Sequence, residues 1–107
     1  MTTTRSFSET IKSDLESNPD FRRALLSEAI AAMVSGDVDT GKTVLREYIN
    51  GTVGFVQLGE ALGRSPKSLM RMLSHSGNPQ ARNLFEIVAW LQKAEGTVLE
   101  IRATSAA

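Results

Sequence analysis

The chain has 107 residues, 41% of them hydrophobic, and its twelve Lys and Arg balance twelve Asp and Glu, so the formal net charge is zero. This length predicts one domain with a modest core. The absence of cysteine excludes disulfides, thiolate catalysis and cysteine-bound zinc. No apolar run reaches the roughly 18 residues that a membrane span requires. The N-terminus also lacks an apolar secretory segment, so we expect a cytoplasmic protein.

Three helices are predicted in the first half of the chain. Residues 1–8, rich in Thr and Ser, are expected to be a disordered N-terminus, although a short first helix is favoured by the spacing of Phe7, Ile11 and Leu15. Asn18 and Pro19 are typical of the start of a second helix, which should run to about residue 35 and face inward with Phe21, Leu25, Ile30, Met33 and Val34. A third helix over roughly residues 40–50 has an apolar face formed by Val44, Leu45, Tyr48 and Ile49.

The segment 36–43, GDVDTGKT, matches the phosphate-binding pattern GxxxxGK[ST], but we reject nucleotide binding. That pattern requires a buried strand before its first glycine, whereas the preceding residues are predicted to be helical. Asp37 and Asp39 would also place carboxylates in a cradle meant for phosphate. We expect instead that Asp37 or Asp39 caps the third helix and that Lys42 lies on its surface.

A helix-turn-helix motif is predicted over residues 55–74. Its first helix should span residues 55–62 and end at Gly63, because glycine readily adopts the left-handed backbone that a sharp turn requires. Ser65 is a typical N-cap and Pro66 a typical first helical residue. The second helix, about residues 66–74, buries one stripe formed by Leu69, Met72 and Leu73.

The surface around this second helix is expected to be basic. No Asp or Glu occurs between Ala61 and Phe85, although the chain as a whole is neutral. Basic and hydroxyl side chains on a short helix suit a DNA major groove, where they contact base edges or phosphates, and a following loop with free donors suits the phosphate backbone. The residues that fit are Arg64, Lys67, Ser68, Arg71, His75, Ser76, the Gly77 amide and Asn78. His75 has no partner suited to metal binding or catalysis.

The last predicted helix covers about residues 81–94, so that the helical domain comprises residues 9–96 and ends at Gly96. Residues 97–107 begin with TVLEIR, which is rich in β-branched residues. Two alternatives are open for this segment. It forms a short strand that pairs with a second copy of the chain and makes a dimer, or it is a tail.

Residues 19–102 resemble a known family. The matching motifs are GDxxxGK, LREYINxTVGF, LGEALGRSPKSLMRML, SGNP and NLFEIVAWLQ. They are similar to those of the small antidote (antitoxin-like) regulators of the lambda-repressor-like helix-turn-helix class, found in bacterial addiction modules and prophage regions. The resemblance implies an all-α domain of about five helices, binding to an operator as a dimer, and a toxin of the mRNA-interferase type encoded alongside.

Two positions depart from the family pattern. Phe55 stands where a phosphate-binding glutamine is usual, although Gln57 lies nearby, and Arg64 stands where an apolar residue is usual. We therefore add Gln57 to the candidate DNA-binding residues and expect Arg64 to contact the DNA backbone. The resemblance also implies that Ser65, with Lys67, Ser68 and Arg71, occupies a recognition-helix position.

The resulting hypothesis is a sequence-specific DNA-binding regulator, a repressor of its own operon and the antitoxin of a toxin-antitoxin module, working as a homodimer. We expect no cofactor, no metal and no catalytic residue, and we do not expect the protein to be an enzyme. The alternative is a protein-interaction module that neutralises a toxin through its acidic N-terminal helices, with Asp14, Glu16, Asp20 or Glu28.

Overall fold

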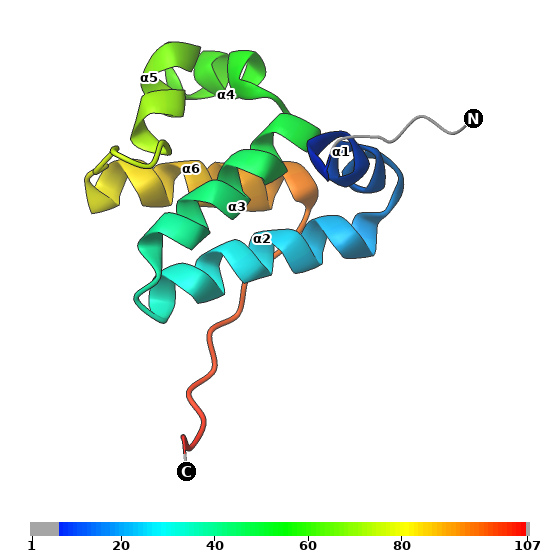
Figure 1. Ribbon diagram of the computed structural model, residues 1–107, viewed down its shortest axis with the longest axis vertical. Helices are drawn as coiled ribbons and strands as arrows, with labels where there is room; N and C mark the ends of the chain where they lie inside the picture. The colour runs from blue at the N-terminus through cyan, green and yellow to red at the C-terminus, as the bar shows by residue number, and fades with distance from the viewer. Residues whose placement is uncertain (1–6, 107) are drawn as a thin grey trace.

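The computed structural model describes residues 7–106, without the side chains of Phe7 and Ser8 (Figure 1). In this part of the chain there are six α-helices, and no strand is formed. The helices are α1 (Phe7–Ser17), α2 (Pro19–Val34), α3 (Val38–Gly51), α4 (Phe55–Leu62), α5 (Pro66–Met72) and α6 (Ala81–Glu95). The prediction of an all-α protein is thus confirmed, with six helices in place of about five. None of the described helices has the length and apolar character that would let it cross a membrane.

Two predictions concern the ends of the chain. A disordered N-terminus was expected for residues 1–8. Residues 1–6 lie outside the described part of the chain, and residues 7 and 8 belong to α1. Within the single chain residues 97–106 form no strand; the segment is irregular, lines a groove with α2 and α6 through Leu99, Glu100 and Ile101, and then leaves the helices (Figure 1). The Leu99 N–H donates to the side chain of Gln92 (2.8 Å) instead of to a neighbouring strand.

The helix α3 lies at the centre of the fold, with α1 and α2 packed on it (Figure 1). Leu45 and Ile49 of α3 are fully buried in the core. Gly41 allows α2 to approach, because a Cβ there would lie 2.3 Å from Cγ of Met33. Gly51 does the same for α1, since its Cβ would meet Leu15 at 2.4 Å. The apolar face predicted for the third helix is therefore the inner face of α3.

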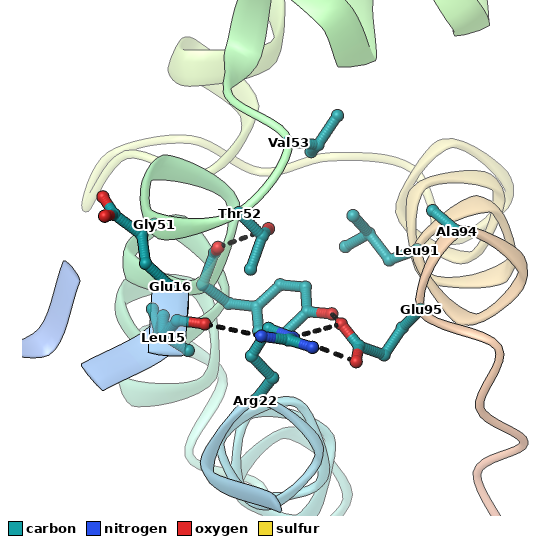
Figure 2. Close-up of a pocket in the computed structure, with 10 residues that line it drawn as sticks. Leu15, Glu16, Arg22, Gly51, Thr52, Val53, Leu91, Ala94 and Glu95 are labelled. Atoms are coloured by element: carbon teal, nitrogen blue, oxygen red, sulfur yellow. Dashed lines mark hydrogen bonds and ion pairs between the residues drawn. The ribbon is translucent and has the colours of Figure 1, made fainter. Parts of the chain in front are cut away.

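Side chains from α2, α3 and α6 meet in one polar cluster at the edge of the core (Figure 2). The Arg22 Nε donates to both oxygens of Glu95 (2.9 and 3.0 Å), and its Nη1 donates to the Leu15 carbonyl (2.9 Å). The Tyr48 hydroxyl donates to Glu95 as well (3.1 Å). Burial and the Glu95 carboxylate raise the pKa of Tyr48 above its ordinary value. Because these polar groups hydrogen-bond to one another, the cluster links α2, α3 and α6.

Candidate nucleic-acid interface

The turn between α4 and α5 has the geometry that the sequence predicts. Gly63 adopts the left-handed conformation (φ 68°) and ends α4. Ser65 caps α5 by accepting a hydrogen bond from the Ser68 N–H (3.1 Å), and Pro66 is the first helical residue. Gly59 of α4 packs directly on the turn, because a Cβ there would lie 2.4 Å from the Arg64 carbonyl oxygen. Two short helices are thus fixed around a tight turn.

The two faces of α5 differ as predicted. Leu69 and the following Leu73 are buried, and Met72 is half-buried against the core. Lys67 and Arg71, one helical turn apart, are exposed on the other side. Neither of these two side chains pairs with an acidic group of the described residues. Both cations are therefore available to an external anion.

A depression of about 390 Å³ lies between α5 and the loop that follows it. Four of the side chains predicted to bind DNA line it: those of Ser68 and Arg71 from the helix, and of Ser76 and Asn78 from the loop. The remaining walls are Met72, Gly77 and Pro79. The structure thus brings hydroxyl, amide and guanidinium donors from two segments to one hollow, without an acidic side chain in its lining.

The other predicted residues lie outside this lining. Arg64 is half-buried and donates to Asn83 of α6 (2.7 Å), with Glu86 at 3.9 Å. The side chain of His75 is 91% exposed, and its Nδ1 lies 3.9 Å from Asp39. Gln57, Ser65 and Lys67 are exposed on α4, in the turn and on α5. Among the described residues there is no cluster of three or more metal-ligating side chains.

The prediction that Lys42 lies on the surface is wrong, because its side chain is only 4% exposed. The Lys42 Nζ donates to the carbonyl oxygens of Gly77 (2.6 Å) and His75 (3.3 Å), and it lies 3.4 Å from Asp39. A long lysine stem can lie along apolar surface while its ammonium group reaches polar partners. One turn further along α3, Arg46 donates to the Leu73 carbonyl (3.4 Å). Sequence reasoning missed both of these cations.

The GxxxxGK[ST] pattern includes Lys42, but in that pattern the lysine would bind the phosphates of a nucleotide. The residues before Gly36 form α2, so the helix predicted there is confirmed. Asp37 caps α3 by accepting from the Thr40 N–H (3.3 Å), as expected for one of the two aspartates. Lys42 then points to carbonyl groups of its own chain.

Gly77 fits a place that no other residue could occupy without displacement. A Cβ there would lie 2.1 Å from the Arg71 carbonyl oxygen and 2.6 Å from that of Met72. The Gly77 N–H donates to the Ser74 carbonyl (3.0 Å). This amide is therefore used inside the loop, and the expectation that it donates to phosphate is wrong.

Comparison of the chain with known protein families, with curated proteins and with solved structures finds no match. The resemblance to antidote regulators therefore depends on the sequence motifs alone.

Proposed function

We propose that the protein is a sequence-specific DNA-binding regulator in which α5 enters the major groove. The observation that carries this proposal is the exposed face of α5, where Lys67, Ser68 and Arg71 stand beside the donors of the following loop. Arg and Lys read guanine edges or bind phosphates, and a serine hydroxyl can contact either. The tight turn and the two glycine contacts support a rigid motif, which base recognition requires.

In this mechanism each subunit contributes one recognition helix, and a dimer binds two half-sites about one helical turn, roughly 34 Å, apart. The loop at Ser76 and Asn78 anchors the phosphate backbone, and the side chains of α5 discriminate between bases. Arg64 is engaged with Asn83, so it acts by fixing the turn against α6.

A surface suited to a second copy of the chain lies away from α5. An apolar groove there is lined by α2, α6 and the C-terminal segment, and it leaves Val34, Phe85 and Ile101 exposed (70%, 59% and 83%). The tail is complementary to itself in charge, because an antiparallel pair centred on Ile101 places Glu100 of one copy opposite Arg102 of the other. The homodimer is therefore proposed to form through this groove and tail.

The motif resemblance extends the proposal to an autorepressor and antitoxin with a cognate toxin. The alternative, neutralisation through the acidic N-terminal helices, is supported by the exposure of Asp14, Glu16 and Glu28. Asp20 is paired with Arg23. A basic toxin encoded beside this chain, bound by it without DNA, would favour the alternative.

The test is fluorescence anisotropy with DNA from upstream of the gene, compared with a random duplex at two salt concentrations. If each subunit neutralises three or four phosphates, log K should fall with log salt at a slope of about −5 to −7 for the dimer. Tight, salt-sensitive binding to the upstream DNA supports the regulator. Equal affinity for both duplexes rejects sequence-specific recognition.

A further inference from the structure

We infer that the depression beside α5 is a binding site for one phosphate group, formed by the backbone N–H groups of Ser76 and Asn78 and organised by the buried Lys42. That the phosphate belongs to DNA rests on the proposed function. The backbone amides of Ser76 and Asn78 as its donors, and Lys42 as its positioning residue, go beyond that function, and they follow from the orientation of two peptide units.

Lys42 holds two carbonyl groups of the loop that follows α5. The oxygens of His75 and Gly77 both accept hydrogen bonds from the Lys42 ammonium group. The described chain contains no cis peptide bond. In a trans peptide the N–H points away from the preceding C=O. The N–H groups of Ser76 and Asn78 are therefore directed away from Lys42.

The N–H groups of Ser76 and Asn78 have no backbone partner in the described chain, in contrast to the Gly77 N–H between them. Ser76 and Asn78 are exposed and line the depression, whereas Lys42 does not. Two outward amides, with the Ser76 hydroxyl and the Asn78 side chain, therefore stand beside the depression as donors to an anion.

The electrostatic surroundings of the depression also favour an anion. The last carbonyls of a helix carry partial negative charge, which disfavours an anion near that end. Here the carbonyls after α5 are turned towards α3, where Lys42 holds those of His75 and Gly77 and Arg46 holds that of Leu73. The negative ends of these dipoles are thus neutralised on the inner side. Arg71 supplies a full positive charge at the depression itself.

Lys42 does not touch the ligand in this arrangement, because its side chain is only 4% exposed. The nearby Asp39 carboxylate, at 3.4 Å, offsets part of its buried charge. Lys42 acts by fixing which edge of the loop backbone faces outward. A neutral side chain of similar length should leave the carbonyls unheld and allow these peptide units to rotate.

The experiment compares the wild-type protein with Lys42→Met and with Lys93→Met, a matched control at an exposed position of α6. Inorganic phosphate is titrated at constant ionic strength against chloride, and amide signals are followed by ¹H–¹⁵N NMR. We expect saturable shifts at Ser76 and Asn78 in the wild type and in Lys93→Met, and their loss in Lys42→Met. Absence of these shifts in the wild type would overturn the site, whether or not Lys42→Met folds.

A second arm uses DNA. For Lys42→Met, affinity of the dimer for the upstream duplex should fall about tenfold per subunit, since each subunit loses one charge-assisted contact, and the salt slope should become less negative by roughly 0.9 per lost phosphate. Lower stability alone would not change the slope. An unchanged slope with intact amide shifts in a folded Lys42→Met would overturn the positioning role. Phosphate-dependent shifts without DNA binding would retain the anion site and reject the proposed function.

Discussion

The ammonium nitrogen of Lys42 lies 2.6 Å from the carbonyl oxygen of Gly77, so a side chain of α3 holds the loop that follows α5. At the other end of α5, Arg64 in the preceding turn donates to Asn83 of α6. Both ends of the candidate recognition helix are therefore tied to the body of the domain. A short helix of seven residues has little stability of its own, so its orientation depends on such ties.

Gly77→Ala should destabilise the fold and displace the loop. The added methyl group would meet two backbone carbonyl oxygens, of Arg71 and Met72, which cannot move as a flexible side chain would. We expect a loss of about 1–3 kcal/mol in the free energy of unfolding, measured by urea denaturation. Gln80→Ala, at an exposed position whose side chain makes no cap hydrogen bond, is the control and should change it by less than about 0.5 kcal/mol. Equal stability of the two variants would contradict the packing described for Gly77.

Arg71→Ala should weaken binding to the upstream DNA with little effect on folding. The side chain is exposed on α5 and lines the depression. If Arg71 reads a base, the loss should be about 1–3 kcal/mol on the upstream DNA and smaller on a random duplex. Equal losses on the two duplexes would mean that Arg71 contacts phosphate only. Lys93→Ala, on α6, serves as the charge-matched control and should bind like the wild type.

The local features of the fold could be predicted because each depends on neighbouring residues. The capping by Ser65 involves a group three positions away, and the turn at Gly63 reflects the conformational freedom of that residue. The buried stripe of α5 follows from helical periodicity. Four side chains that line the depression could also be predicted, because they lie close together in the sequence.

The long-range features could not be predicted in this way. Lys42 meets a carbonyl 35 residues later, and Arg22 meets Glu95 across 73 residues. Such pairs depend on how the helices pack, and a lysine or an arginine in an amphipathic helix has the same local pattern whether its end is solvated or buried. Val34 shows the converse error, since it was expected to face inward and is 70% exposed beside the apolar groove.

Tyr48→Phe should make stability less dependent on pH in the alkaline range. Burial and Glu95 raise the pKa of Tyr48, so the folded protein retains a proton that the unfolded chain releases above about pH 10. The stabilisation by neutral Tyr48 is complete below that pH and is lost as pH rises towards the folded pKa. Urea denaturation of both proteins, at neutral pH and above pH 10, should show a steeper alkaline loss for the wild type.

Tyr48→Phe also removes one hydrogen bond to Glu95, which keeps Arg22 as its partner. At neutral pH we therefore expect a loss of only about 0.5–1.5 kcal/mol. Tyr48 is the only tyrosine in the chain, so phenolate absorbance in the ultraviolet reports its titration directly. A native protein that titrates with an ordinary tyrosine pKa would disprove this account.

Ile101→Asp should weaken the proposed dimer. Ile101 lines the apolar groove and is 83% exposed in the single chain, so the substitution places a carboxylate at the surface where two copies would meet. Sedimentation equilibrium should show the dimer dissociation constant rising more than about tenfold, since a charge buried in an apolar contact is costly. Val98→Asp is the control, because Val98 is equally exposed (82%) but does not line the groove. Equal effects of the two substitutions would show that the groove is not the contact surface.

The register of the tails can be tested by reversing charges. In an antiparallel pair centred on Ile101, Glu100→Arg alone sets two guanidinium groups opposite each other, and Arg102→Glu alone sets two carboxylates opposite each other, so each variant should dimerise less than the wild type. A mixture of the two variants restores both opposite-charge pairs and should form a heterodimer, detectable by native mass spectrometry. Each restored pair should stabilise the dimer by only about 0.2–1 kcal/mol, so the comparison should be made at low salt, where charges are least screened. Homodimers as abundant as in the wild type, with no preference for the mixed pair, would rule out this register.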